Sequence, residues 1–145
     1  MRDVNTSLLK NYFNAFTGIT YNSVPVPVYS GILPDNVNPN NYILFGEVSN
    51  NDLSTKGSSD TNTLMRVSIY TFSEKYQSTL PVNEIANQVY QRIYPYTQFN
   101  LDLTEDDLQI FSTELVSDNT QQIALDNSRA YVDRVIIFRH KIFHR

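Results

Sequence analysis

Two apolar runs separated by a long polar segment constrain this chain more than any other feature. Residues 42–48 (YILFGEV) and 64–72 (LMRVSIYTF) are rich in branched and aromatic side chains, which is typical of strands. The segment between them, SNNDLSTKGSSDTNT, has a single apolar side chain, Leu53. Strand pairs in compact domains usually close within about two to five residues. We therefore expect a long polar loop between two central strands, either disordered or kept for an interaction with another macromolecule.

The composition indicates one folded domain over residues 1–145, because a chain of 145 residues can bury a core without disulfides. Hydrophobic residues make up 41% and charged residues 18%, which argues against a fully disordered chain. Cysteine is absent, so disulfides and thiolate metal sites are excluded. No apolar stretch approaches the roughly 18 residues of a membrane span, and MRDVNTSLLKNYF lacks the apolar core of a secretory signal. We expect a soluble protein, intracellular at synthesis, with no membrane association.

Two segments have apolar residues at helical spacing. The first covers residues 6–16, and Gly18 follows closely enough to end it. The second begins at Pro81, which suits the first turn of a helix, and ends before Pro95. The apolar positions are Leu8, Leu9, Tyr12, Phe13 and Phe16 in the first segment and Val82, Ile85, Ala86, Val89 and Ile93 in the second. Each pattern predicts an amphipathic helix.

The remaining segments read as strands and loops. Residues 24–29 (VPVPVY) suit an edge strand or an extended arm, because proline has no backbone donor. Residues 99–103 and 108–116 are further strand candidates, and residues 118–129 are polar enough to predict a loop. Residues 131–143 are apolar on both faces at their centre, which is typical of a strand inside a sheet. This order predicts an α+β domain with two main helices packed on one face of a largely antiparallel sheet.

Metal-binding chemistry has few candidate residues. His140 and His144 could share a zinc ion on a helix, but on a strand they lie about 13 Å apart at ~3.3 Å per residue. We therefore expect surface histidines. The acidic run at residues 105–107, after Thr104, is compatible with a hard-cation site. A turn or short helical start capped by Thr104 explains it better, because calcium loops need ligands at alternate positions around a glycine.

Catalytic motifs are also lacking. The sequence has no nucleophile elbow, phosphate loop or dinucleotide fingerprint, and its four glycines could hardly build a phosphate cradle. We therefore expect a protein that is not an enzyme and that has no cofactor.

Basic residues gather at the C-terminal end, at Arg129, Arg134, Arg139, Lys141 and Arg145. On a strand, Arg139, Lys141 and Arg145 would share one face with Asp133. This patch could contact an acidic protein partner, or it could be a charged strand face that prevents aggregation. Nucleic-acid binding is less favoured, because the formal net charge is −4 and the isoelectric point is near 5.0.

The order of segments, and above all VPVPVYSGILPDNVNPNNYILFGEV, resembles the bacteriophage tail completion or tail terminator family. In that family an extended V-Y segment precedes a turn-rich link, a P-Y-I-x-L-G strand, a Ser/Thr-bearing loop, an alternating strand and an amphipathic helix. The matching positions here are Val28–Tyr29, Tyr42–Gly46, Thr55, Val67–Tyr70 and Val82–Ile93, with Leu101 and Leu103 in the strand after the helix. The chain departs from the pattern where Asn41 replaces a frequent proline, and where Tyr70 or Phe72 replaces a frequent tryptophan.

The resemblance implies a structural virion protein that forms a ring, a hexamer or a dodecamer, at the phage neck or tail end. Such a ring joins portal, adaptor or stopper proteins to the tail tube, and DNA passes through its lumen without sequence recognition. The protein would wait in the host cytoplasm before assembly into the virion. We expect these residues at interfaces: Val26, Val28, Tyr29, Asn51, Asp52, Leu53, Thr55, Lys56, Asp60, Arg134, Arg139, Lys141 and Arg145. The alternative is a small non-enzymatic adaptor or binding module that binds a protein partner along a sheet edge.

Overall fold

The computed structural model describes residues 3–37, 39–52, 60–73, 79–95, 101–124 and 130–144. It includes the α-helices α1 (Asn5–Phe16) and α2 (Leu80–Ile93) and the short 3-10 helix η2 (Thr104–Asp106). Its strands are β1 (Thr20–Tyr21), β2 (Val24–Pro25), β3 (Val28–Ser30), β4 (Asn41–Asp52), β5 (Asp60–Ser73), β6 (Leu108–Ala124) and β7 (Ala130–His144).

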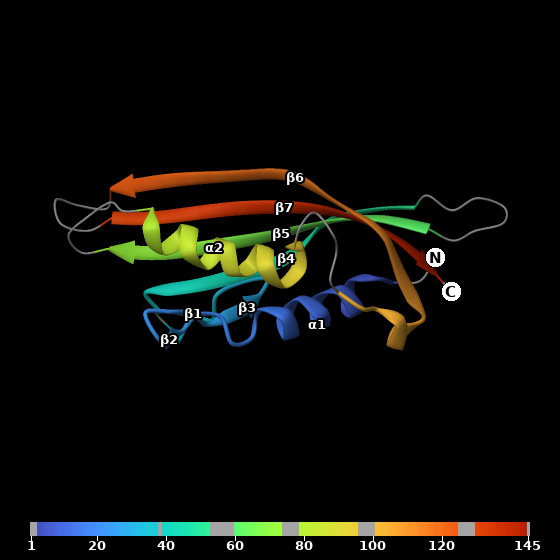
Figure 1. Ribbon diagram of the computed structural model, residues 1–145, viewed down its shortest axis with the longest axis horizontal. Helices are drawn as coiled ribbons and strands as arrows, with labels where there is room; N and C mark the ends of the chain where they lie inside the picture. Colours follow the sequence, from blue (N-terminus) through green and yellow to red (C-terminus); the bar gives the residue numbers. More distant parts are fainter. Residues whose placement is uncertain are drawn as a thin grey trace.

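One five-stranded sheet dominates the molecule, in the order β3-β4-β5-β7-β6, and β1 and β2 form a separate two-stranded ribbon. All neighbouring strands of the main sheet are antiparallel except β3 and β4, which are parallel. Both α-helices lie against the same face of the sheet (Figure 1). The predicted α+β class, with a largely antiparallel sheet and helices on one face, is therefore confirmed.

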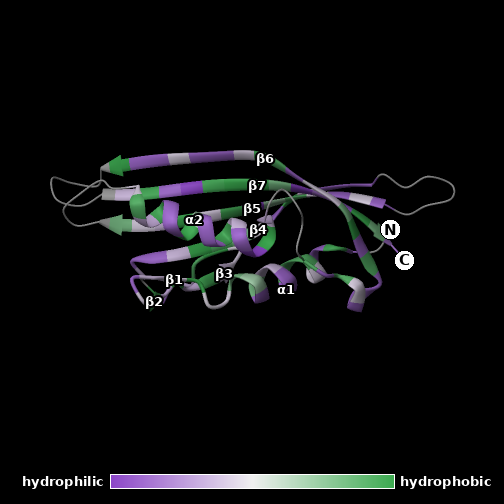
Figure 2. Ribbon diagram, in the orientation of Figure 1, coloured by the Kyte–Doolittle hydropathy of each residue, from purple (hydrophilic) through white to green (hydrophobic). Residues whose placement is uncertain are grey.

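The C-terminal strand β7 lies between β5 and β6, as its apolar centre predicts. Figure 2 shows this apolar stretch in the middle of β7. On the side that faces the helices, β7 contributes Val132, Ile136, Phe138 and Ile142, each 0–1% exposed. The core therefore sits between the helices and the central strands β5 and β7.

The two predicted helices are present, and both predicted ends are confirmed. Helix α1 ends at Phe16, and Gly18 has the left-handed backbone conformation (φ +93°) that glycine adopts without strain. Helix α2 has Pro81 in its first turn and ends at Ile93, two residues before Pro95. All five apolar positions predicted for α2 are buried. In α1 the prediction was wrong for Phe13, which is 47% exposed, because the buried face follows the spacing of Leu8, Tyr12 and Phe16.

The polar segment between β4 and β5 is mostly strand, and the loop boundaries expected at residues 49–63 were wrong. Both strands run on, pairing Asn50 with Thr63 and Asp52 with Thr61, after a bulge between Glu47 and Ser49. The hydroxyl of Thr63, which is fully buried, donates to Oδ1 of Asn50 at 2.8 Å. These polar side chains fit a strand because they satisfy one another's hydrogen bonds. The rest of the predicted loop, residues 53–59, lies outside the described residues.

The second half of β6 was wrongly expected to be a loop. The strand extends from Leu108 to Ala124, with two bulges in its first half, and Gln121 pairs with Asp133 of β7. Its polar composition misled the prediction, because an edge strand that is exposed on both faces has no need of apolar residues. The predicted strand at residues 99–103 is also absent from its described part, residues 101–103, which precede η2.

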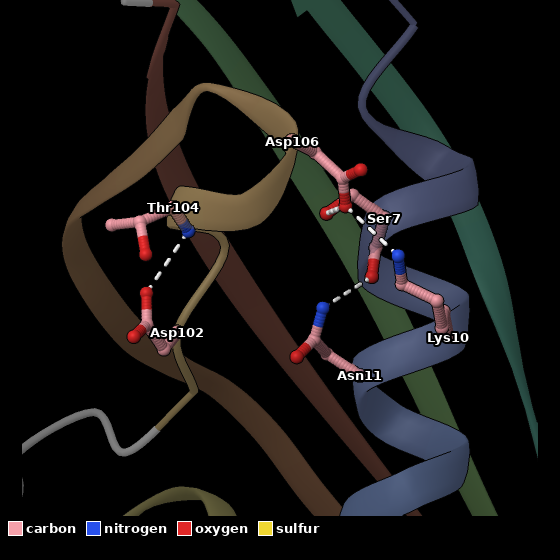
Figure 3. A network of polar contacts seen from close by, with 6 residues as sticks. All are labelled: Ser7, Lys10, Asn11, Asp102, Thr104 and Asp106. Carbon is pink, nitrogen blue, oxygen red and sulfur yellow. Dashed lines mark hydrogen bonds and ion pairs between the residues drawn. The ribbon is translucent and has the colours of Figure 1, made fainter.

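Glu105 and Asp106 of the acidic run lie in the short 3-10 helix η2, Asp107 follows it, and Asp106 docks the helix on α1 (Figure 3). Ser7 Oγ donates to Asp106 Oδ2 at 2.7 Å, and Lys10 Nζ lies 3.2 Å from the same oxygen. The hydrogen bond from Ser7, and then that from Lys10, lower the pKa of Asp106. The predicted capping role of Thr104 was wrong, because Thr104 is the first residue of η2 and its backbone N–H donates to Asp102 Oδ1 at 2.9 Å.

Candidate interaction surfaces

Residues 24–29, the proline-bearing segment predicted at a sheet edge, lie partly in the core and partly at the surface. Strand β3 is the outer strand on one side of the sheet, as predicted. Val28 packs partly against the core, and the ring of Tyr29 lies edge-on to that of Tyr42, with centroids 6.5 Å apart. Val26 is only 5% exposed and its N–H donates to Ile19 O at 2.9 Å. Val26 is therefore a core residue, and the structure leaves Val28 and Tyr29 as the edge candidates.

The interface residues predicted in the polar segment between β4 and β5 do not share one environment. Asn51 and Asp52 are exposed at the end of β4. Asp60 is 8% exposed at the start of β5, opposite Phe143 of β7, so it is part of the folded subunit and offers little surface to a partner. Leu53, Thr55 and Lys56, which were also predicted at interfaces, lie outside the described residues.

Arg134 is engaged inside the subunit, on the face that carries the helices. Its Nε and Nη2 donate to the two carboxylate oxygens of Asp118 on β6, at 2.8 and 2.6 Å, and its Nη1 donates to Asn83 Oδ1 of α2 at 3.0 Å. The hydroxyl of Tyr90 donates to Asp118 Oδ2 at 2.6 Å. The hydrogen bond from Arg134 lowers the pKa of Asp118, and the same bond raises that of Arg134. Arg134 therefore joins β6, β7 and α2, and it does not share a surface with the other basic candidates.

Arg139 and Lys141 project from the opposite face of β7, the face that they share with Asp133, as strand alternation predicts. Arg139 Nη1 lies 3.2 Å from Glu114 Oε1 on β6. The ammonium of Lys141 lies 5.3 Å from the centre of the Phe111 ring. Arg145, the third member predicted for this face, lies outside the described residues.

The face of the sheet away from the helices carries a row of aromatic rings that the sequence alone did not reveal. Tyr42 of β4 stacks on Tyr70 of β5 with ring centroids 4.8 Å apart, and Tyr70 stacks on Tyr131 of β7 at 5.5 Å. Tyr29 of β3 extends the row at one end and Phe72 of β5 lies beside Tyr131. Burial in this row raises the pKa of Tyr42 and of Tyr131. In each strand these residues occupy positions whose side chains point to this face of the sheet. The register in which the strands pair then brings the rings into contact.

A shallow hollow of about 350 Å³ lies beside the row, lined in part by Leu44, Arg66, Tyr70 and Val135. Leu44 and Val135 are half-buried and Arg66 is exposed. This side of the sheet thus combines apolar area with a few charges, which is typical of a surface that meets another protein.

The prediction of surface histidines was wrong for His140, which is fully buried. Its Nε2 is hydrogen-bonded to the hydroxyl of Tyr12, and its Nδ1 lies 2.9 Å from Thr113 Oγ1. Burial lowers the pKa of His140 to about 3, so the ring is neutral at physiological pH. His144 lies at the end of β7 with Nε2 3.0 Å from Thr61 Oγ1. Each ring therefore has a structural hydrogen bond to the folded chain.

Within the described residues, no group of three or more His, Asp or Glu side chains could hold a metal ion. No helix in that part of the chain is long and apolar enough to cross a membrane.

The fold has a counterpart among solved structures. No protein-family model matches the chain, and no curated protein matches it. The chain is similar in structure to a chain of the virion of a native gene transfer agent particle, with a TM-score of 0.56 and 14% sequence identity. The similarity covers 80% of this chain and 78% of that chain. The two chains therefore share a fold over most of their lengths.

Proposed function

We propose that this chain is a structural subunit of a phage-like virion, where it forms a ring at the neck or at the end of the tail. The observation that carries the proposal is the fold shared with a chain of a gene transfer agent virion over about four fifths of both chains. The segment order that resembles phage tail terminators supports the same role. In this role the subunit joins portal, adaptor or stopper proteins to the tail tube.

The architecture suits a ring subunit because both α-helices cover one face of the sheet (Figure 1). This leaves the aromatic row on the other face, together with the two outer edges of the sheet, for contacts with neighbours. Identical subunits in a ring meet through two different surfaces of each copy. A stable interface of this kind buries on the order of 1,600 Å². A hexameric or a dodecameric ring would each need interfaces of about this size.

The charges of the subunit suit a ring that lets DNA pass without holding it. Arg134 is paired with Asp118 and Arg139 with Glu114. Phosphate binding depends on basic side chains whose charge is available to the nucleic acid. Because these two arginines are already paired and the net charge is −4, the subunit gives DNA little to bind. The proposed role includes no catalytic step and no cofactor.

The proposal is tested by inactivating the gene in the phage-like element that encodes it and examining the particles by electron microscopy. We expect unjoined heads and tails, or heads that lose their DNA, and normal particles when the intact gene is supplied in trans. Normal particle yield and infectivity without the chain would contradict the proposal. Binding of a single partner protein by a strictly monomeric chain that is absent from particles would favour the adaptor role.

A further inference from the structure

The outer edge of β6 is a long strand edge whose second half lacks the bulges, prolines and lysines that usually protect one. Strand β6 has 17 residues and is the last strand of the sheet, paired with β7 alone among the described strands. Its sequence, LQIFSTELVSDNTQQIA, contains no proline, glycine, lysine or arginine. Natural proteins protect edge strands with such residues, with bulges or with short length, because an open edge pairs with other chains.

The second half of β6 is the part best suited to pairing. Two bulges interrupt the first half, between Ile110 and Ser112 and between Leu115 and Ser117, whereas Ser117–Ala124 pairs with β7 without interruption. The side chains from Asn119 to Ile123 are all exposed, and Figure 2 shows this half as mostly hydrophilic. An unbroken run without bulges presents its backbone groups at regular spacing.

The acidic side chains of β6 give its edge little protection, because arginines of β7 neutralise them. Asp118 accepts two hydrogen bonds from Arg134, and Glu114 is paired with Arg139. Apolar side chains are exposed as well, with Phe111 62% and Val116 41% exposed. Exposed apolar residues on an open strand edge favour association with another strand.

The opposite side of the sheet offers a second edge that is protected along only part of its length. Strand β3 follows Pro25 and Pro27 and covers only Ile43–Phe45 of β4. No described strand covers the outer side of β4 beyond that point, and Glu47–Asn51 are largely exposed there. We call this stretch, Glu47–Asn51, the β4 arm; it begins with the bulge between Glu47 and Ser49, after which pairing with β5 is regular.

The directions of the strands allow the two edges to meet. Successive antiparallel pairs make β6 run antiparallel to β4. When two copies lie side by side in the same orientation, β6 of one copy therefore runs antiparallel to β4 of the next. The second half of β6 is level with Asn41–Gly46 of β4, so one copy must also be displaced along the strands before this half reaches the β4 arm of the next and the sheet continues across the contact. Residues 119–124 of β6 are uncharged, so they receive Glu47 without like-charge repulsion.

We propose that the outer edge of β6 binds the β4 arm of a second copy of the chain, so that one sheet extends from subunit to subunit. The inference rests on the proposed function in taking the partner to be an identical copy. Pairing of β6 with β6 would make a closed dimer and leave both β4 arms uncovered, whereas β6-to-β4 pairing repeats in one direction and can close into a ring.

Lysine substitutions at matched positions test the edge. Asn119 of β6 and Asn87 of α2 are both exposed, so Asn119→Lys and Asn87→Lys make the same chemical change on and off the edge. Native mass spectrometry compares both variants with the wild-type chain at high concentration. We expect a ring mass for the wild type and for Asn87→Lys, and loss of that mass to the 16.7 kDa monomer for Asn119→Lys. Equal circular dichroism spectra and melting temperatures establish that both variants are folded.

Thiol cross-linking identifies the strand that β6 contacts in the second copy. The chain has no cysteine, so only the introduced thiols react. One population carries Asn119→Cys and a second, tagged population carries Asn51→Cys in the β4 arm. Both positions lie on the face away from the helices. We expect a bifunctional maleimide to join the two populations to each other far more than either to itself. Cross-linking within the Asn119→Cys population alone would overturn β6-to-β4 pairing.

The outcomes separate this inference from the proposed function. A ring that survives Asn119→Lys unchanged overturns the role of the edge and leaves the virion role standing. A wild-type chain that stays monomeric at its highest soluble concentration also overturns the edge inference, because an open edge of this length should pair by itself. The virion role fails only when particles are complete without the chain.

Discussion

The hydroxyl of Tyr12 on α1 is hydrogen-bonded to Nε2 of His140 on β7, in the interior between the helix and the sheet. Thr113 of β6 contacts the other ring nitrogen, with Oγ1 2.9 Å from Nδ1. Phe138 stacks beside the imidazole, with centroids 6.3 Å apart. One buried histidine therefore links α1 to two strands, and its neutral form is part of the folded state.

This histidine predicts a loss of stability in mild acid. The pKa of His140 is about 3 in the folded chain and near 6.5 when exposed, so between these values the unfolded chain binds one more proton. The free energy of unfolding therefore falls as the pH drops below 6.5, by about 1.4 kcal/mol per pH unit at most. The pKa values of Asp118 and Asp106 are lowered from 3.8, so protonation of these carboxylates reduces the free energy of unfolding only near and below pH 3.8.

Urea unfolding between pH 4.5 and 7.5 measures this effect. His140→Gln keeps a neutral polar side chain but removes the titration, so we expect a lower stability at pH 7.5 and a flatter dependence on pH. The difference between wild type and variant isolates His140 from His144, which is present in both. Parallel pH profiles for the two proteins would contradict the assignment.

Arg134 is expected to matter for folding more than Arg139. Arg134→Lys removes the two parallel hydrogen bonds to Asp118, because an ammonium group cannot reproduce the guanidinium fork. We expect the free energy of unfolding to fall by about 2 kcal/mol. Arg139→Lys is the matched control, since its pairing with Glu114 is exposed and worth about 0.5 kcal/mol. Chemical denaturation measures the free energy of unfolding of both variants. An equal decrease for the two would contradict the larger role expected for Arg134.

Val26 is expected to behave as a core residue. Val26→Ala removes two methyl groups from a site that is 5% exposed, so the free energy of unfolding should fall by about 2 kcal/mol. Val24→Ala, two residues away at 63% exposure, should change it by less than about 0.5 kcal/mol. Thermal and urea unfolding compare the pair. A normal stability for Val26→Ala, together with weaker self-association, would return Val26 to the interface.

Periodicity predicted much of the fold because the elements that bury one face repeat their apolar residues. Helix α2 is the best example, with Val82, Ile85 and Val89 all fully buried as predicted. Strand β7 was placed inside the sheet because its apolar centre suits neither a surface strand nor a loop. Polar strands carry no such signal. Residues 119–123 of β6 are extended only because β7 pairs with them, and pairing leaves no trace in composition.

The candidate surfaces were less predictable than the elements. Tyr42, Tyr70 and Tyr131 lie far apart in the sequence and form a row only because the register of three strands aligns them. Arg134 and Arg139 both belong to a basic tail, yet alternation along β7 places them on opposite faces. His140 was expected at the surface because, on a strand, it lies too far from His144 to share a metal ion with it. Its contact with Tyr12, 128 positions earlier, depends on tertiary packing.

The most direct test of the virion role is to count and locate the chain in purified particles. Quantitative mass spectrometry gives the number of copies per particle, and cryo-electron microscopy of particles carrying a tagged chain gives their position. The proposal predicts six or twelve copies arranged as a ring where head and tail meet or where the tail ends. Absence of the chain from purified particles, or a copy number that no ring accommodates, would contradict it.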